Sequence, residues 1–407
     1  YILDKDDFIF GSHRSHGEIL AKGLSAIDKL DDGELMDVME NFFDGAILRV
    51  VEGKQKDKNN VKELAMDFLL YGALAEIFGR ETGFHKGLGG SMHAFFTPFG
   101  IYPNNAIVGG SADISVGAAL YKKINRKKGI VIANIGDASM GCGPVWEAMC
   151  VATMDQYKKL WEEPYRGGLP LIFNFYDNLY GMGGQTSGET MGFGILARIG
   201  AGVNPEQMHA ERVDGFNPLA VIDAMKRKKQ ILEEKNGPVL LDTLTYRFSG
   251  HSPSDASSYR TKEELEAWMA QDPLVAYRKN LMDSHVAKED TFAEMQESIG
   301  ERITKVCKWA TDDTLSPRMD LTLQPDRIAD LMFSNERIEK MEDRECEVLL
   351  PKEENPRVIQ IKRKVRTATE NGKPVSPNRM YNFRDGVFEA ILDKFYTDPT
   401  LTAFGGI

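Results

Sequence analysis

Residues 130–138 read IVIANIGDA, a continuous apolar run from Ile130 to Ile135 that ends in Gly136-Asp137-Ala138. Two further apolar runs follow along the chain, Leu169–Phe175 and Val239–Thr245. The stretches between them predict helices from about Ser111, from Pro144 to Trp161, and from the cap pair Asn217-Pro218 to Asn236. Short apolar strands that alternate with helices are typical of a parallel sheet covered on both faces. We therefore predict an α/β fold with helices on both faces of the sheet.

The flanking segments have more varied patterns. Upstream, Val61–Arg80 carries apolar residues at helical spacing, whereas Glu81–Gly110 is crowded with glycine, histidine and proline and is predicted to be a loop at a functional site. Downstream, Thr261 and Glu264 have the spacing of a capping box and predict a helix over 263–271. Residues 336–380 are rich in charge, contain four prolines and predict a linker arm; residues 381–407 turn helical again.

Composition excludes several classes of protein. The 407 residues include 61 acidic and 50 basic side chains, a net charge of −11 that is interspersed along the chain, so nucleic acid is not expected as a partner. Four cysteines make neither a disulfide framework nor a metal motif and favour a reducing compartment, the cytoplasm or an organelle lumen. No apolar run approaches the roughly 18 residues of a membrane helix, so no membrane association is expected. Neither Tyr1 nor Ile407 resembles a natural terminus, and we expect the sequence to be incomplete.

Polar side chains follow two of the predicted strands. Asp137 comes directly after the first strand, and Asp177-Asn178-Leu179-Tyr180 follows the second. Because open α/β sheets hold ligands at the carboxyl ends of parallel strands, these residues are expected to face one cleft. Carboxylate, amide and carbonyl oxygens suit Mg²⁺, which usually shares its shell with phosphates. An ordinary pair of strand-to-helix turns has the same composition and remains the alternative at this point.

Five separate segments resemble the thiamine-diphosphate-dependent decarboxylating component of 2-oxo acid dehydrogenase complexes, specifically its α subunit of the pyruvate and acetoin type. They are His13–Gly17, Lys86–His93, Ala106–Gly109, Asn178–Met182 and Tyr246–Ser252, and they occur in the order of the family. The likeness extends from about Asp4 to Leu274. It implies the thiamine-diphosphate-binding fold for residues 1–335, with 336–380 as the arm and 381–407 as the start of a β-type pyrimidine-binding domain.

The resemblance also implies a set of site residues. Magnesium ligands fall on the side chains of Asp137 and Asn178 and on the Tyr180 carbonyl. The other cofactor contacts that it implies are Gly136, Ala138, His13 and Arg14 near the diphosphate, the backbones of Ala106 and Val108 at the aminopyrimidine ring, and His251 near the diphosphate and the reacting centre. His251 and His16 are the implied catalytic histidines, with roles in positioning and proton transfer. Among the other histidines, His85 is expected to be mainly structural, whereas His93 is left open between a structural and a functional role. Arg247 is expected to hold its loop in shape.

Some positions depart from the family pattern. Ala138 stands where many relatives have glycine, His13 where they have tyrosine, and Ser249 where they have histidine. The interval from Asp137 to Asn178 is 41 residues, which is longer than usual, and the surplus falls on the polar stretch Tyr157–Gly168. We expect this stretch to lie on the surface without moving either ligand.

The implied activity is oxidative decarboxylation of a pyruvate-like 2-oxo acid, with thiamine diphosphate and Mg²⁺ as cofactors. The acyl group would pass to a lipoyl-bearing acyltransferase partner. A β-type subunit or domain would complete the active site, and a homo-oligomer is expected. Two alternatives stay open: an acetoin-cleaving or other ketol-transferring enzyme, which would share every motif, and a non-catalytic cofactor-binding scaffold or regulatory subunit.

Overall fold

The computed structural model describes residues 1–11, 15–54, 60–104, 106–192, 194–332, 342–363, 369–374 and 383–402. The chain divides into two compact units, Tyr1–Met319 and Asp320–Ile407. The candidate functional residues that the structure describes all lie in the first unit, and each unit is described by itself below.

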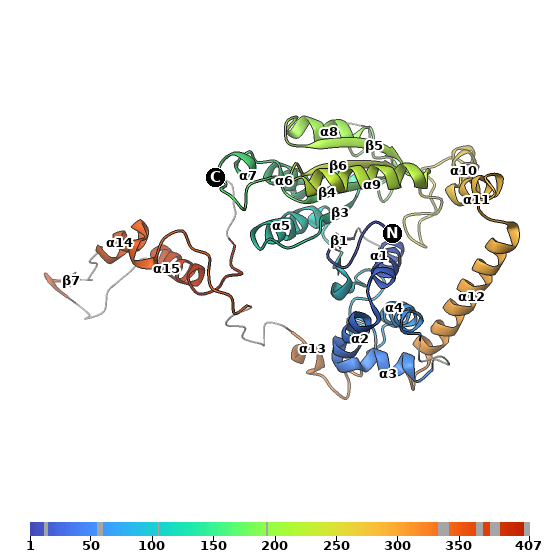
Figure 1. Ribbon diagram of the computed structural model, residues 1–407, viewed down its shortest axis with the longest axis horizontal. Coiled ribbons are helices and arrows are strands. Elements are labelled where there is room, and N and C mark those ends of the chain that lie inside the picture. The colour runs from blue at the N-terminus through green and yellow to red at the C-terminus, as the bar shows by residue number, and fades with distance from the viewer. Residues whose placement is uncertain are drawn as a thin grey trace. The chain divides into compact units, whose positions relative to one another are not determined.

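A single parallel sheet organises the first unit (Figure 1). Within the described residues it has six strands in the order β2-β1-β3-β4-β6-β5. Their bounds are β1 Phe8–Phe10, β2 Ile101–Tyr102, β3 Val131–Gly136, β4 Leu171–Asp177, β5 His209–Asp214 and β6 Val239–Leu244. β3, β4 and β6 are the strands predicted from apolar runs, and the α/β fold class is confirmed. The short strands β1 and β2 and the polar edge strand β5 were not predicted.

Each face of the sheet has its own apolar core, because alternate residues of a strand point to opposite faces. On one face Ile132, Ile172 and Leu241 pack with residues of α1 His16–Lys29, α2 Asp32–Asn41, α3 Ala46–Glu52, α4 Val61–Ile77, α9 Pro218–Glu233 and α12 Glu289–Thr311. On the other face Ala133 and Phe173 pack with residues of α5 Gly110–Ile124, α6 Gly143–Ala152, α7 Gln156–Lys159 and α8 Leu196–Val203. Burial on both faces explains why the central strands are continuously apolar in sequence.

The predicted helix from Pro144 to Trp161 is wrong as one element, because it is interrupted after Ala152. The Thr153 carbonyl accepts a hydrogen bond from the Asn204 side chain at 3.0 Å. This bond provides a partner for one of the carbonyls that the end of a helix leaves without an intrahelical donor. The chain resumes as the short helix α7.

Other predicted boundaries shift by a few residues. The helix predicted over Val61–Arg80 ends at Ile77, and the one predicted over 263–271 is α10 Lys262–Met269, capped by the Thr261 side chain. Asn217 caps α9 as predicted. The loop Glu81–Gly110 contains a 3₁₀ turn, Thr97–Phe99, and strand β2. Further 3₁₀ turns are Phe42–Gly45 and Asp137–Gly141, and α11 spans Pro273–Asp283.

The second unit contains short elements, and those between residues 352 and 374 lie within the segment 336–380 that is predicted to be an arm. Its described elements are α13 Arg327–Asp330, the 3₁₀ turn Lys352–Glu354, α14 Pro356–Arg363, the two-stranded hairpin β7 Thr369–Glu370 with β8 Lys373–Pro374, and α15 Phe383–Phe395. Asn371 and Gly372 both have positive φ, the geometry that a two-residue hairpin turn requires. The assignment of residues 381–407 to a β-type domain stays a prediction.

Candidate functional site

The predicted site segments meet at one edge of the sheet. β1, β3, β4 and β6 are neighbours in the sheet and run parallel, so their carboxyl ends lie at the same edge. His16, Asp137, Asn178 and His251 follow these four strands in turn. The segment Ala106–Gly109 joins the same edge from β2, and the Ser111 hydroxyl donates to the Gly11 carbonyl at 3.0 Å. His13 and Arg14 lie outside the described residues.

Asp137 is buried at the end of β3, with 2% of its surface exposed. Its Oδ2 accepts a hydrogen bond from the Thr186 hydroxyl at 3.0 Å. Burial raises the pKa of its carboxyl, while hydrogen bonds from Thr186 and from the backbone of Ala138 and Leu179 oppose that shift. A buried carboxylate whose protonated form is favoured in this way is stabilised by a nearby cation.

The loop after β4 is brought against Asp137. The Leu179 backbone bonds to the Asp137 carboxyl, and a Cβ built on Gly181 would lie 3.3 Å from the Ala138 Cβ. Leu179 adopts φ +69°, a left-handed conformation that is uncommon outside glycine. In this turn Asn178 Oδ1 accepts from the Tyr180 N–H at 3.0 Å. The two predicted ligand segments are therefore neighbours in space.

Asp177, which precedes Asn178, is a further acidic residue beside Asp137. Arg212 on β5 forms ion pairs with Asp177 and with Asp242, the latter at 2.9 Å. The pKa of Asp177 is raised to about 7, chiefly by burial and then by the carboxylates of Asp242 and Asp137, against the effect of Arg212. One guanidinium thus serves Asp177 and Asp242, while Asp137 relies on hydrogen bonds for its stabilisation.

His251 lies in the loop after β6, which Arg247 ties to the β4 loop. Arg247 donates to the Gly181 carbonyl at 3.1 Å and to the Tyr259 hydroxyl at 2.8 Å, and its Nη1 lies 3.3 Å from His251 Nδ1. Because a guanidinium can only donate, Nδ1 is the acceptor and the neutral ring carries its proton on Nε2. The expected loop-holding role of Arg247 thus has a structural basis.

Asp255 fixes the rest of the same loop. Its carboxylate accepts from the His251 N–H at 2.7 Å and from the Tyr259 hydroxyl at 2.6 Å. The Tyr259 hydroxyl is the main cause that lowers the pKa of Asp255 to about 2, followed by the His251 and Ser257 N–H groups. Asp255 therefore fixes the backbone N–H of His251, while Arg247 contacts its ring.

Tyr180 is anchored from α10. Its hydroxyl donates to Glu264 Oε1 at 2.7 Å, and the Tyr246 hydroxyl donates to the same oxygen at 3.0 Å. Burial, followed by the Glu264 carboxylate, raises the pKa of Tyr180 to about 12. The phenol therefore stays protonated and keeps the Tyr180 backbone, whose carbonyl is a predicted ligand, in a fixed place.

Ala106, Val108 and Gly136 line a common small cavity of about 40 Å³. Asn134, Ser111 and Ser139 supply polar groups to its wall. Gly109 is the N-cap residue of α5 and has φ +84°, and a Cβ there would lie 3.0 Å from the Val145 side chain, so this position favours glycine. The structure thus brings the Gly136 backbone, predicted to meet the cofactor diphosphate, close to the backbones of Ala106 and Val108, predicted to meet the aminopyrimidine ring.

A buried glutamate organises the glycine-rich loop beside these residues. The Glu76 carboxylate on α4 is fully buried and accepts four backbone N–H groups, from His85 at 2.8 Å, Gly87 at 2.9 Å, Gly89 at 2.6 Å and Gly90 at 3.1 Å. The next residue of this loop, Ser91, contacts His16 Nε2 through its carbonyl at 2.9 Å and its hydroxyl at 3.0 Å. Glu76 therefore supports the position of a predicted catalytic histidine.

The two other histidines of this loop have backbone contacts, as expected for His85. His85 lies within hydrogen-bond distance of the Phe95 backbone and stacks on the Phe95 ring with centroids 3.5 Å apart. His93 Nδ1 lies 3.3 Å from the Asn104 carbonyl.

The donors at this edge fit a magnesium-bound diphosphate. Asp137 offers a buried carboxylate, Asn178 an amide oxygen and Tyr180 a backbone carbonyl, a set of hard oxygen ligands with one formal charge. Within the described part of the chain there is no cluster of three or more histidine, cysteine or acidic side chains placed to hold a metal, so a protein-only metal cage is not found there. The remaining ligands would come from the phosphates and water, as is usual for magnesium.

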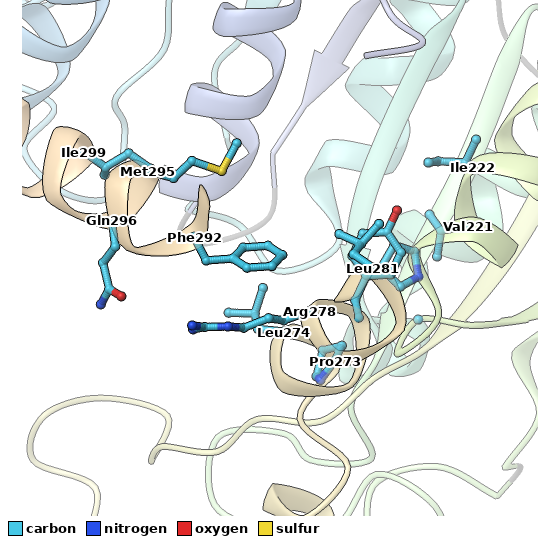
Figure 2. Close-up of a pocket in the computed structure, with 13 residues that line it drawn as sticks. Val221, Ile222, Pro273, Leu274, Arg278, Leu281, Phe292, Met295, Gln296 and Ile299 are labelled. Carbon is cyan, nitrogen blue, oxygen red and sulfur yellow. The ribbon is translucent and has the colours of Figure 1, made fainter. Parts of the chain in front are cut away.

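A larger groove of about 730 Å³ lies elsewhere, between α9, α11 and α12 (Figure 2). Leu274, Phe292 and Met295 line it, and Arg278 is the one charged side chain in its lining. It includes none of the predicted site residues, and one guanidinium among apolar groups is a poor match for a diphosphate.

None of the helices in the described ranges has the length and apolar character of a membrane-spanning segment.

Sequence reasoning missed the residues that support the site from a distance. These are Glu76, Thr186, Arg212, Asp242 and Glu264. None belongs to the five segments that resemble the family. Glu76 within the apolar pattern of α4 and Asp242 within the apolar run of β6 were the available signals, because a charged residue at a buried position requires partners.

Comparisons with known proteins identify the family to which the chain belongs. The family model described as "Dehydrogenase E1 component" matches residues 54–318. The pyruvate dehydrogenase E1 component subunit alpha of Rickettsia felis is 32% identical over 248 residues, 61% of this chain and 71% of that protein. The mitochondrial protein of that name from Dictyostelium discoideum is 33% identical over 238 residues, 58% of each chain. Among solved structures, a transketolase from Leishmania mexicana covers 60% of this chain and 39% of its own at 14% identity, with a TM-score of 0.33. The chain belongs to the dehydrogenase E1 component family, as the sequence predicted.

Proposed function

We propose that this protein is the α-type half of a thiamine-diphosphate-dependent enzyme that oxidatively decarboxylates a pyruvate-like 2-oxo acid. The acyl group passes to the lipoyl group of an acyltransferase partner. Family membership and the names of the relatives, which are pyruvate dehydrogenase subunits, support this reaction class.

One observation carries the proposal for this chain. The buried Asp137 carboxylate and the turn Asn178-Leu179-Tyr180 come from neighbouring strands and are joined by the Leu179 backbone. A carboxylate, an amide oxygen and a carbonyl so placed form half of a magnesium shell.

Different residues of the chain bind the metal, the diphosphate and the aminopyrimidine ring. Asp137, Asn178 and the Tyr180 carbonyl would hold Mg²⁺, and Gly136 and Ala138 would meet the diphosphate. The resemblance assigns the same role to His13 and Arg14, which lie outside the described residues. The backbones of Ala106 and Val108 hold the aminopyrimidine ring. Bound thiamine diphosphate supplies the electron sink that stabilises the carbanion left when carbon dioxide departs. Thr186 orients Asp137, and Glu264 fixes Tyr180.

His251 and His16 position and exchange protons near the reacting centre. Arg247 holds His251 Nδ1, which leaves the protonated Nε2 as the donor. Ser91 contacts Nε2 of His16, which fixes the direction of that ring. Both rings are therefore held by neighbouring loops.

The proposal includes partners and a domain plan. Residues 1–335 form the diphosphate and magnesium domain, 336–380 an arm, and 381–407 the start of a β-type domain. A β-type subunit or domain supplies the rest of the active site, and the assembly is a homo-oligomer.

The test compares Asp137→Ala with Asp283→Ala, a matched change at the end of α11. Thiamine diphosphate binding is measured by calorimetry, with the β-type partner present, in buffer with Mg²⁺ and in buffer with a chelator. We expect Asp137→Ala to weaken binding at least about tenfold, the loss of a charge-assisted ligand, and Asp283→Ala to have no effect. Equal affinity of Asp137→Ala and wild type would refute the metal assignment.

Activity is then measured by reduction of an artificial electron acceptor with pyruvate, branched 2-oxo acids and acetoin in turn. Turnover with a 2-oxo acid supports the proposed reaction, and turnover with acetoin alone supports the ketol-cleaving alternative. Cofactor binding without turnover on any of these substrates would indicate the scaffold alternative.

A further inference from the structure

A pocket of about 470 Å³ lies at the opposite edge of the sheet from the candidate site. Its lining includes Ile130, Pro170 and Lys235, which precede β3, β4 and β6. Six residues of strand separate the two edges along β3, roughly 20 Å at about 3.3 Å per residue. The pocket is therefore separate from the cofactor site.

The lining is strongly basic in a chain whose net charge is −11. It contains one acidic residue, Glu233, and seven cationic ones, Lys122, Lys123, Arg126, Lys127, Lys128, Arg166 and Lys235. The two helix C-termini that end here, those of α5 and α9, each contribute only about half a negative charge. These partial negative charges therefore offset only a small part of the positive charge of the pocket lining.

Three segments distant in sequence build this pocket: the end of α5, the end of α9 and the loop Pro164–Gly168. That loop belongs to Tyr157–Gly168, the stretch that lengthens the interval between Asp137 and Asn178 relative to the family. Backbone bonds fix it, since the Gly168 N–H donates to the Lys235 carbonyl at 2.7 Å and the Gly167 N–H donates to the Tyr157 carbonyl at 2.9 Å. Residues 158–167 lie at least partly exposed, as predicted, whereas Tyr157 and Gly168 at the ends of the stretch are buried. The loop Pro164–Gly168 forms one wall of the pocket.

Side chains on that wall are already directed by local contacts. Arg166 Nε donates to the Trp161 carbonyl at 3.0 Å, and Arg126 lies over the Tyr165 ring, 5.8 Å from its centroid. Lys123 donates to the Gly167 carbonyl. Burial, and then the charge of Lys235, lower the pKa of Lys123 to about 8, whereas Glu163 opposes this. A bound anion would relieve the repulsion between these cations.

We propose that this pocket binds a small anion carrying two or more phosphate groups. Several cations converge from three segments on one concavity, an arrangement that suits several phosphate oxygens at once, and the volume falls in the range of small-molecule sites. Lys122 takes a structural part, because its amine is buried and donates to the carbonyls of Asp6 and Lys128. The exposed groups Lys127, Lys128 and Arg166 make the contacts to the ligand.

The first test measures binding of inorganic triphosphate and of inorganic phosphate to the full-length protein by calorimetry. Lys127→Ala with Arg166→Ala is compared with Lys54→Ala and Lys279→Ala, which removes two exposed cations outside the pocket. We expect triphosphate to bind the double pocket variant at least about tenfold more weakly than wild type, while the control pair binds as wild type does. Unchanged affinity of the pocket variant would overturn the proposal, because triphosphate would then be bound elsewhere, as at the cofactor site. Equal affinity of wild type for phosphate and triphosphate would also overturn it.

A second measurement uses the wild-type protein and does not depend on the folding of a variant. Lysines are modified with an amine-reactive reagent, with and without triphosphate, and the sites are quantified by mass spectrometry. We expect triphosphate to protect Lys127 and Lys128 at least about threefold and to leave Lys54 and Lys279 unaffected. Equal modification of all four lysines in both conditions would contradict the proposal.

Discussion

The Glu76 carboxylate offers the most quantitative test of how the glycine-rich loop is held. Its Oε2 accepts the His85 and Gly87 N–H groups, and its Oε1 accepts those of Gly89 and Gly90. In Glu76→Gln one oxygen keeps two of these partners, while the amide nitrogen, which can only donate, faces the other two. Two charge-assisted hydrogen bonds at about 1.5–3 kcal/mol each are lost, so we expect a destabilisation of roughly 3–6 kcal/mol. That is a large share of the roughly 5–15 kcal/mol that stabilises a typical domain.

The assay has a global and a local readout. Denaturant unfolding reports the overall loss, and hydrogen exchange followed by mass spectrometry on a peptide covering residues 83–93 reports opening of the loop alone. The matched control is Glu40→Gln, an exposed glutamate at the end of α2, which should change stability by less than about 0.5 kcal/mol. If Glu76→Gln had the unfolding midpoint and the exchange rates of wild type, the role given to this carboxylate would be refuted.

Two further predictions concern the cofactor site and pH. Thr186→Val removes the hydroxyl that donates to Asp137. The loss of a hydrogen bond of about 1 kcal/mol should weaken Mg²⁺-dependent thiamine diphosphate binding about fivefold. Thr190→Val is the control, and equal effects of the two variants would contradict the role given to Thr186. Burial, partly offset by Asp7 and Asp4, lowers the pKa of Lys22 from 10.5 to about 8. Between these two pH values the unfolded chain binds more protons than the folded protein, so the free energy of unfolding should rise with pH. Unfolding free energies at pH 7.5 and 9.5 should therefore increase less in Lys22→Met than in wild type, and an identical increase would exclude Lys22 as a source of the slope.

Local patterns were sufficient for the central strands and for the site segments. β3, β4 and β6 are buried on both faces, so their own residues must be apolar, and this signal lies within each stretch. Asp137 and Asn178 could likewise be placed at the ends of their strands, because the strand itself and the polar residues after it are adjacent in sequence.

The sequence by itself therefore determined the α/β class, the central strands and the segments that meet at the candidate-site edge of the sheet. Only the tertiary structure decided that Thr186 would bond to Asp137, that Glu76 would hold the loop beside His16, and that Asn204 would bond to the Thr153 carbonyl at the end of α6. The same holds for the basic pocket, whose three segments are far apart along the chain. The physical reason is that burial imposes a period on the residues of a single element, whereas the partner of a polar group can come from any part of the chain that the fold brings within hydrogen-bond distance.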